Sequence, residues 1–376
     1  MHSYELEPRR RRPKQDGFTL VEMMVTMSII AFLIAILLPV FQRVRESARD
    51  TTCKSNLRQI GQGLTQYSTR MGSYCSGAWD WKRDGAVHEV GWVADLVNQG
   101  NPVGELLCPS SPNRLSEVFH HLLTMDGAAN TCADSLGGPD RTLPDNTVAE
   151  NPCSKISKSG ANKAEVLNEL LLKKGYNTNY AAGWFLVRTD VNIDRLGALI
   201  NSRSGCQKGQ KERSCTIGPL IQARIGGAKV PANLIPIMGC GNMADMGEHM
   251  LTEQVGDYPA GTPLAASYTP GPRDKTTLGV PQITGSGSGP SRWWGPWNAT
   301  MQDYRNFGVI HGGPTGGSCN ILFVDGNVQS FVDTNNDGFL NNGFPASTAT
   351  GYADDTVELP PAMIYSGWSI DSIRIP

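Results

Sequence analysis

The chain has 376 residues, of which 39% are hydrophobic, so it is long enough to bury at least one substantial core. Its formal net charge of −2 gives no reason to expect a nucleic-acid partner. The 42 glycines and 24 prolines, with 18% charged residues, favour a loop-rich exported domain over a helical cytosolic enzyme.

A basic stub precedes a long apolar segment at the N-terminus. Residues 1–17 contain Arg9 to Arg12 and Lys14 against three acidic residues, so the stub carries +2 and the remainder −4. Residues 18–40 read FTLVEMMVTMSIIAFLIAILLPV and contain one charge, Glu22. At about 1.5 Å per residue, a helix of this length crosses the roughly 30 Å hydrocarbon core of a bilayer. The basic stub predicts a cytoplasmic N-terminal side, which puts the bulk of the chain outside the inner membrane.

Three interpretations of this segment compete. A secretory signal peptide needs small residues at a cleavage site after the apolar run, and LLPVFQRVRESARD contains no A-x-A pattern. A plain single-pass anchor explains the apolar run but not its beginning. The beginning, GFTLVE at residues 17–22, resembles the type IV prepilin signal G-F-T-L-x-E. The resemblance implies that a prepilin peptidase cleaves between Gly17 and Phe18, removing the leader 1–17, and that Phe18 is then N-methylated.

Glu22 and Pro39 are the two residues of this segment with an expected role in assembly. An ionised carboxylate in hydrocarbon costs several kcal/mol unless it is paired. Cleavage creates an ammonium group at Phe18, and the resemblance implies that Glu22 meets that group on a neighbouring subunit. The alternative is a glutamate that lies near the membrane interface. Pro39 matches the proline that kinks the helix in these proteins, so we expect it to bend the helix rather than end it.

Residues 41–70 are expected to continue the helix as an amphipathic segment. Apolar residues recur in it at steps of three to five, with polar residues between them: Phe41, Val44, Ala48, Cys53, Leu57, Ile60, Leu64 and Tyr67. This stripe predicts a spine against which residues 71–376, an extracytoplasmic globular domain, pack a sheet. Packing explains the stripe without any functional site.

The middle of the chain predicts short elements separated by turns. Residues 163–174 are expected to form a helix that Gly175 caps. Residues 228–238, AKVPANLIPIM, predict a buried strand interrupted by two prolines. Residues 256–298 are rich in Gly, Pro and Ser and predict a long surface loop. Its tryptophans, Trp293, Trp294 and Trp297, suit either stacking on a carbohydrate or covering the core.

The nine cysteines include no pair with C-x-x-C spacing. In an oxidising compartment several of them are expected to pair, and the odd number leaves at least one free, for which Cys53 is the candidate. The connectivity stays open. The chain lacks HExxH, G-x-S-x-G and a P-loop lysine, so we do not predict an enzyme.

A β-hairpin is expected at residues 320–332, with a two-residue turn at Asp325-Gly326. This register puts Ile321, Phe323, Val328 and Val332 on one face, toward the N-terminal helix. His311-Gly-Gly followed by Asp325-Gly326 resembles a family of large pilin-like proteins with a C-terminal His–spacer–Asp-Gly signature, although the spacer here is longer. LLCPSSP at 106–112 and CKSNLRQIGQGL at 53–64 resemble the same family. The alternative for Asp325 is a simple turn residue.

The segment after the hairpin matches D-x-N-x-D-G, the first half of an EF-hand or dockerin-type calcium loop. The expected ligands are Asp333, Asn335, Asp337, the carbonyl of Phe339, and Asn341 directly or through water. Position twelve is Phe344 rather than a carboxylate, so Asp354 or Asp355 would complete the shell. Resemblance to type II secretion pseudopilins, some of which hold calcium near the C-terminus, favours the ion. The alternative is a polar turn.

Together these features predict an α+β fold, with one long N-terminal helix against an antiparallel sheet that carries large loop insertions. The predicted function is a structural subunit of a type IV pilus-like or type II secretion pseudopilus filament. Its expected partners are prepilin peptidase with its N-methyltransferase activity, other pilin-like subunits and the inner membrane. The alternatives are a membrane-anchored surface binding protein that uses the prepilin signal without forming filaments, and an exported hydrolase.

Overall fold

The computed structural model describes residues 17–125, 132–142, 144, 146–158, 160–192, 199–228, 230–274, 300–313 and 316–360. The chain divides into two compact units, Met1–Ser47 and Ala48–Pro376. Helix α1 (Leu20–Met71) contributes residues to both units. The mixture of this helix with antiparallel strands is the predicted α+β class.

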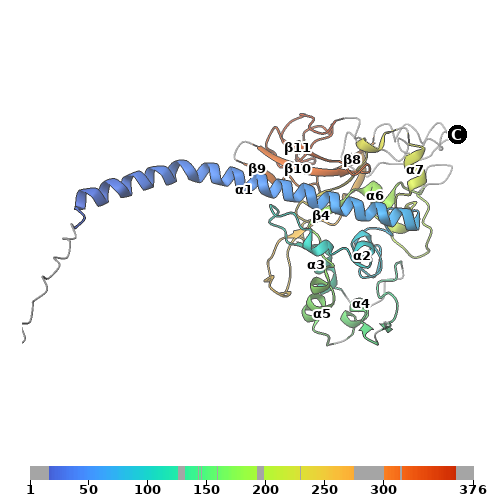
Figure 1. Cartoon of the computed structure of the whole chain (residues 1–376). Helices are drawn as coiled ribbons and strands as arrows, with labels where there is room; N and C mark the ends of the chain where they lie inside the picture. The colour runs from blue at the N-terminus through green and yellow to red at the C-terminus, as the bar shows by residue number, and fades with distance from the viewer. Residues whose placement is uncertain are drawn as a thin grey trace, which may run out of the picture. The chain divides into compact units, whose positions relative to one another are not determined.

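A five-stranded antiparallel sheet forms the centre of the second unit (Figure 1). Its strand order is β11-β10-β5-β4, and β9 pairs with the free length of β10 beside β5. The strands are β4 (Tyr180–Ala182), β5 (Pro236–Cys240), β9 (His311–Gly313), β10 (Gly316–Phe323) and β11 (Val328–Val332). The strands of this sheet therefore come from three widely separated parts of the sequence, around residues 180, 238 and 311–332.

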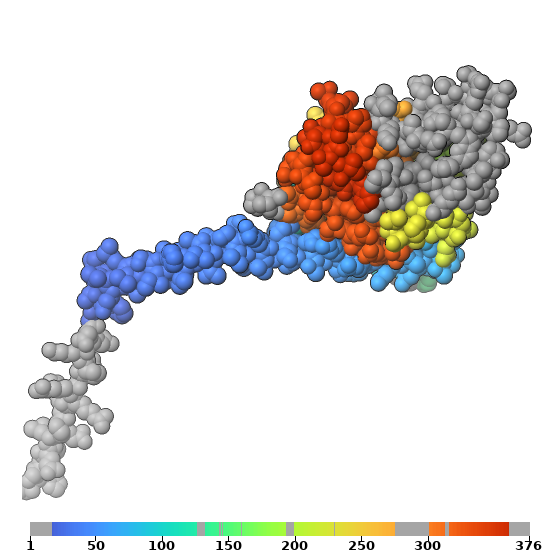
Figure 2. Space-filling view, turned by 90° about the horizontal axis from the view of Figure 1, so that it is seen from above, coloured from blue at the N-terminus to red at the C-terminus, as the bar shows by residue number. Residues whose placement is uncertain are grey.

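The Ala48–Met71 part of α1 packs against one face of this sheet. Its apolar stripe from Cys53 to Tyr67 is buried, as predicted. Gly61 allows the close approach, because a Cβ there would lie 3.1 Å from Leu322 Cδ1 of β10. Figure 2 shows the orange residues of the C-terminal part resting on the light-blue segment of α1. Gly61 lowers the intrinsic stability of the helix but lets α1 and the sheet approach each other closely.

The hairpin is present, but its predicted turn and register are wrong. The loop has three residues, because Phe323 N–H bonds Asn327 O at 2.9 Å and Gly326 N–H bonds Phe323 O at 2.9 Å. Gly326 has φ +85°, the left-handed conformation that follows a type I turn in such loops. The extra residue shifts the pairing by one, so Leu322 faces Val328 and Ile321 faces Gln329.

This shift changes which side chains meet the helix. Leu322 and Asn320 point toward α1, and Asn320 Nδ2 donates to Asp50 Oδ1 at 2.7 Å. Ile321 and Phe323 belong to the other face, because successive side chains of a strand alternate and both neighbours of Ile321, Asn320 and Leu322, point toward α1. Val332 is 52% exposed. The prediction that Ile321, Phe323 and Val332 pack on the N-terminal helix is therefore wrong.

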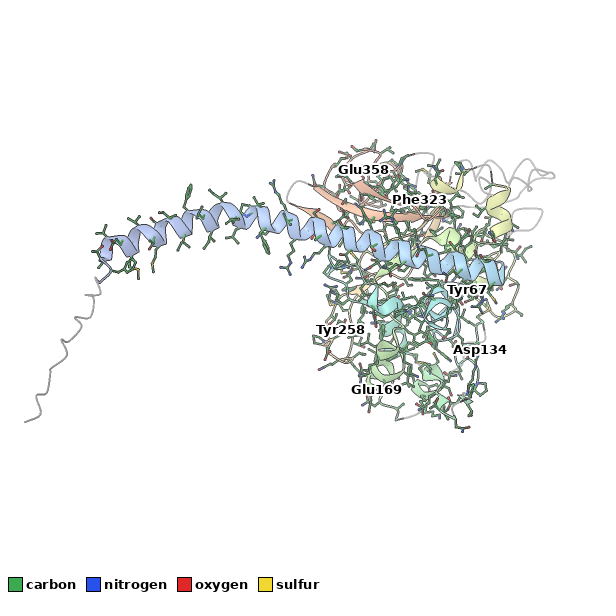
Figure 3. The ribbon with its side chains drawn as sticks, viewed as in Figure 1. Tyr67, Asp134, Glu169, Tyr258, Phe323 and Glu358 are labelled. Atoms are coloured by element: carbon green, nitrogen blue, oxygen red, sulfur yellow. A yellow bond between two sulfur atoms is a disulfide. The ribbon has the colours of Figure 1, made fainter. Side chains whose placement is uncertain are left out.

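Short helices and two-stranded ribbons complete the second unit. The helices are α2 (Trp92–Val97), η1 (Val103–Glu105), α3 (Val118–Leu123), α4 (Pro152–Ile156), α5 (Lys163–Leu170), η2 (Leu172–Lys174), α6 (Trp184–Arg188), η3 (Arg213–Cys215), α7 (Gln222–Gly226) and η4 (Ala232–Leu234). The ribbons pair β1 (Leu115–Ser116) with β6 (Leu264–Ala265), β2 (Arg141–Thr142) with β3 (Val148–Ala149), and β7 (Gly271–Asp274) with β8 (Thr300–Asp303). In Figure 3, Phe323 and Glu358 lie on one side of α1, and Asp134, Glu169 and Tyr258 lie on the other.

Three predicted segments have different outcomes. The helix over 163–174 is confirmed as α5 and η2, and Gly175 ends it in the left-handed conformation. The strand predicted from residue 228 begins only at Pro236, because residues 232–234 form η4. The predicted surface loop is wrong for residues 264–272, which are buried and include β6 and the first part of β7. Trp293, Trp294 and Trp297 lie outside the described residues.

Arg188 and Asp84 form a fully buried ion pair in the second unit. Arg188 Nη1 donates to Asp84 Oδ1 at 2.9 Å, and its Nη2 donates to the other carboxylate oxygen. Arg188 Nε donates to Lys211 O at 3.0 Å, and the guanidinium lies 5.4 Å from the centre of the Tyr268 ring. These contacts satisfy both charges inside the core.

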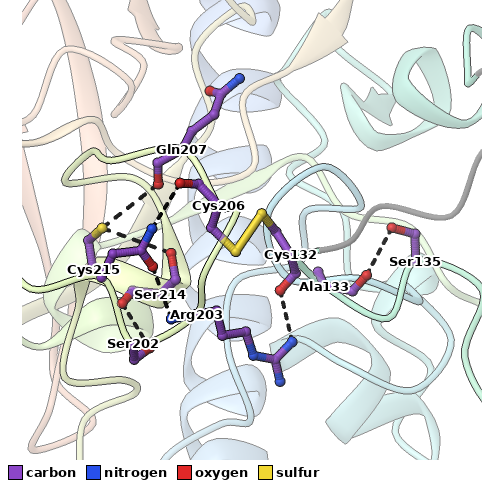
Figure 4. The surroundings of a disulfide bond; sticks show 10 residues. Cys132, Ala133, Ser135, Ser202, Arg203, Cys206, Gln207, Ser214 and Cys215 are labelled. Carbon is purple, nitrogen blue, oxygen red and sulfur yellow. Dashed lines mark hydrogen bonds between the residues drawn. A yellow bond between two sulfur atoms is a disulfide. The ribbon is translucent and has the colours of Figure 1, made fainter.

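One disulfide joins Cys132 to Cys206 in the described part of the chain (Figure 4). Arg203 Nη1 donates to Cys132 O at 2.8 Å, so a hydrogen bond also joins the two loops, and Asn201 Nδ2 donates to Cys206 O at 2.8 Å within the second loop. The other seven cysteines are free and buried. Cys53 is one of them, as predicted, but six more share that state.

Candidate functional site

The described chain begins at the predicted cleavage site. Gly17 and Phe18 are both exposed, and the leader residues before them lie outside the described residues. Phe18 and Thr19 precede the first turn of α1. The peptide bond between Gly17 and Phe18 therefore lies in non-helical, accessible chain, as a peptidase substrate requires.

Glu22 caps the N-terminus of α1. Thr19 N–H and Thr19 Oγ1 donate to Glu22 Oε2 at 2.9 and 2.8 Å, and Glu22 N–H bonds Thr19 Oγ1 at 3.3 Å. This reciprocal pattern is a capping box, with threonine at the N-cap and glutamate three residues later. This role was not predicted from the sequence, although T-x-x-E before an apolar run signals it.

The apolar part of α1 in the first unit is exposed on every side. Met23, Met24 and Val25, three consecutive positions that point in different directions around the helix, are 51%, 65% and 50% exposed. The helix is long and apolar enough to cross a membrane. It continues through Pro39 without ending, as predicted. Phe41 and Val44 are also exposed, so the buried stripe starts at Cys53 rather than at Phe41.

The predicted calcium loop wraps backbone N–H groups around three polar side chains. Asp333 Oδ2 accepts from Gly338 N–H at 2.8 Å, and Asn335 Oδ1 accepts from Asp337 N–H at 3.2 Å. Asp337 Oδ1 accepts from Phe339 N–H at 2.9 Å. Gly338 has φ +87°, which allows the sharp turn at this point. The loop thus gathers oxygen atoms of Asp333, Asn335 and Asp337 around one turn.

Hydrogen bonds determine which polar side chains lie beside this loop. Asn335 Nδ2 donates to Asp354 Oδ1 at 2.9 Å, which brings Asp354 to the loop, whereas Asp355 accepts from Ala346 N–H at 2.7 Å. Asn341 is buried, and its Oδ1 accepts from the N–H groups of residues 343 and 344. Glu358, which the sequence analysis did not consider, accepts from Thr334 N–H and Asn341 N–H at 2.8 and 3.0 Å.

The two parts of the His–spacer–Asp-Gly signature have different surroundings. Asp325 and Gly326 form the exposed hairpin turn, and Asp325 Oδ1 accepts from Asn327 N–H at 3.0 Å. His311 begins β9, is 2% exposed, and points its Nε2 at two sulfur atoms. The Nε2 atom lies 3.3 Å from Cys108 Sγ and 3.5 Å from Cys240 Sγ. Asp325 is a turn residue, and His311 belongs to a cluster.

This cluster also contains Cys53, whose Sγ lies 3.4 Å from Cys240 Sγ. Hydrogen bonds from Cys240 and Cys53 lower the pKa of the Cys108 thiol to about 4. The cluster was not predicted from the sequence because its members are far apart in the chain. A signal was present, because three segments that resemble one family each contribute a member: Cys53, Cys108 and His311.

A second group of ionisable side chains joins Glu117, His121 and Glu248. His121 Nε2 lies 2.8 Å from Glu248 Oε2, and His121 Nδ1 lies 3.5 Å from Asp80 Oδ1. Burial lowers the pKa of His121, but hydrogen bonds to Asp80 and Glu248 outweigh it and raise that pKa to about 9. The ring is therefore cationic at neutral pH and pairs with the carboxylates of Asp80 and Glu248.

Comparison with known families identifies the N-terminal part. Residues 12–38 match the prokaryotic N-terminal methylation motif, so this is a pilin-like protein whose helix carries the signal read by prepilin peptidase. Residues 42–102 match the family described as protein of unknown function (DUF1559), which covers the buried half of α1 and the segment through α2. No curated protein and no solved structure matches the chain.

Proposed function

We propose that this pilin-like chain is a structural subunit of a type IV pilus-like or type II secretion pseudopilus filament. In this proposal the chain is cleaved between Gly17 and Phe18, which removes the leader, and Phe18 is N-methylated. Before assembly the protein resides in the inner membrane, with its globular domain on the extracytoplasmic side. The observation that carries the proposal is the segment of α1 from Leu20 to Val40, which is apolar, is exposed around its whole circumference and contains a single charged side chain, Glu22.

A helix of this kind needs apolar surroundings on all sides, first lipid and then neighbouring helices. Leaving lipid for a bundle gains little from the hydrophobic effect, since lipid tails are as apolar as leucine. Side-chain packing and electrostatic pairing must therefore favour the bundle. Glu22 carries the one charged side chain of residues 18–40. We expect its carboxylate to form an ion pair with the N-terminal amine of Phe18 on a neighbouring subunit. Pairing of these groups would also fix the axial register between subunits.

The test is the location of the protein in cells that express it with the rest of its assembly system. Surface filaments sheared from the cells and imaged by immunogold electron microscopy are expected to contain it. A pseudopilus short enough to stay within the envelope is expected to yield cross-links between α1 helices of neighbouring chains. Protein found only as uncross-linked monomers in the membrane fraction would instead favour the lone surface-binding anchor.

We also propose that the loop after β11 binds one structural calcium ion through Asp333, Asn335, Asp337 and the carbonyl of Phe339. The side-chain oxygens alternate along the turn, as in loops that hold this hard cation. Asp354 is the candidate to complete the shell, because it already accepts a hydrogen bond from Asn335. Asn341 lies behind the loop and orders the following turn.

Calcium is expected to raise the melting temperature of metal-free protein by roughly 5–10 °C at a hundredfold excess over the dissociation constant, since saturation at that level contributes about 2.7 kcal/mol. Asp337→Ala is expected to abolish this increase, while Asp325→Ala, which alters an exposed aspartate outside the loop, leaves it intact. Differential scanning calorimetry with calcium or magnesium added measures the effect. An identical melting temperature with and without calcium would remove the proposal.

A further inference from the structure

Four potential metal ligands converge where α1 crosses the sheet. Cys53 comes from α1, Cys108 from the loop after η1, Cys240 from the end of β5, and His311 from the start of β9. Their three sulfur atoms and one ring nitrogen all lie within 4.8 Å of one another. Each of the four residues is at most 2% exposed. The folding of the second unit therefore gathers four soft or borderline ligand atoms at one buried point.

The spacing of these atoms fits a tetrahedral ion. A Zn²⁺ ion with Zn–S of about 2.3 Å and Zn–N of about 2.0 Å separates its ligand atoms by about 3.8 Å for sulfur pairs and 3.5 Å for sulfur–nitrogen pairs. The observed separations are 3.4 Å for Cys53–Cys240, 3.3 Å for Cys108–His311 and 3.5 Å for Cys240–His311. These three separations lie within a few tenths of an ångström of the tetrahedral values, and the other three pairs of ligand atoms lie within 4.8 Å of each other.

The second layer of contacts orients the ligands. Asn179 holds the Cys108 loop from both sides, because its Oδ1 accepts from Cys108 N–H at 2.8 Å and its Nδ2 donates to Cys108 O at 3.1 Å. Tyr180 O–H donates to Cys53 Sγ at 3.7 Å. His311 Nδ1 lies 3.9 Å from Asp50 Oδ1, so the ring points one nitrogen at the sulfurs and the other at a carboxylate. A carboxylate behind a ligand histidine is a recurring feature of zinc sites.

We propose that Cys53, Cys108, Cys240 and His311 bind one structural zinc ion. Three thiolates and one imidazole in a closed tetrahedron form a ligand set that zinc occupies in structural sites, with no position left for substrate. The ion joins the buried half of α1 to β5, β9 and the loop after η1. It thereby fastens the helical spine to the globular domain, independently of whether the protein forms filaments.

The competing explanation is oxidation, because Cys53 and Cys240 are close enough to form a disulfide in an oxidising compartment. A disulfide would consume two of the three thiols and leave Cys108 and His311 beside it. The two explanations differ in measurable ways. Zinc binding requires all three cysteines as thiolates. A Cys53–Cys240 disulfide would instead appear in a peptide map as two peptides joined by their cysteines, and the protein would hold no metal at this cluster.

The test uses the full-length mature protein, purified in detergent with a histidine-free tag and equilibrated with zinc. Elemental analysis by inductively coupled plasma mass spectrometry is expected to find about one zinc per chain. Cys108→Ser and Cys240→Ser are each expected to lower that content at least tenfold. Cys153→Ser, which removes a free buried thiol in α4 outside the cluster, is the matched control and keeps the zinc.

Cobalt substitution of the unaltered protein provides a readout that does not depend on whether a variant folds. The account predicts intense thiolate-to-cobalt charge-transfer absorption together with the visible bands of a tetrahedral site. Protein without zinc or cobalt, a Cys53–Cys240 disulfide in the peptide map, or undiminished zinc in Cys108→Ser would each overturn the proposal. Iron or copper in place of zinc at full occupancy would overturn the choice of metal.

Discussion

Replacing Glu22 by glutamine is expected to lower incorporation into filaments or α1 cross-links at least tenfold. The substitution removes the charge that pairs with the Phe18 amine of a neighbour, while a glutamine at this position still closes a capping box with Thr19. Loss of about 1.4 kcal/mol of pairing suffices for a factor of ten. Incorporation is measured as the ratio of assembled to membrane protein in quantitative immunoblots.

Thr19→Val is the matched control for Glu22→Gln. It removes the hydroxyl that exchanges hydrogen bonds with Glu22 but keeps the carboxylate. The expected cost is limited to the helix cap, about 0.5–2 kcal/mol, and assembly is expected to persist. The opposite pattern, in which the glutamine variant assembles and the valine variant does not, would show that Glu22 acts only as a cap.

Arg188→Met is expected to destabilise the globular domain by about 3–5 kcal/mol, because it leaves the buried carboxylate of Asp84 without its partner. In a domain of this size such a change corresponds to a decrease in melting temperature of roughly 10 °C. Thermal unfolding of the mature protein in detergent, followed by circular dichroism, measures the decrease.

Two further variants separate loss of the ion pair from loss of packing. Asp84→Asn combined with Arg188→Met removes both charges and is expected to recover part of the lost stability. Lys173→Met breaks a solvent-exposed ion pair with Glu169 and is expected to cost less than about 1 kcal/mol. Equal melting temperatures for Arg188→Met and Lys173→Met would contradict a stabilising role of the buried pair.

Local sequence signals were sufficient for α1, for the helix over residues 163–174 and for the existence of the hairpin. The apolar segment, the stripe from Cys53 to Tyr67 and the Gly175 cap each depend on neighbours within a few turns of the same helix. The hairpin register was not predictable in the same way. The dipeptide Asp-Gly is compatible with a two-residue turn and also with the last two positions of a three-residue loop. The chain forms the three-residue loop.

Contacts between distant segments account for the remaining errors. Leu264 is a strand residue because it pairs with Leu115, and the Gly- and Pro-rich composition around it gives no sign of that pairing. The zinc ligand set likewise comes from four separate elements, and no two of its cysteines are close in sequence. Motif spacing indicates sites built on one turn or loop, such as the proposed calcium loop, and misses those that tertiary packing assembles.

The mass of the mature N-terminus tests the central claim most directly. Top-down mass spectrometry of the protein isolated from its native cells is predicted to find a chain that begins at Phe18 and carries one methyl group on its amine. That result would establish a processed helix retained as the spine of the protein. A chain that still bears residues 1–17, or one that lacks the entire apolar segment, would contradict the account.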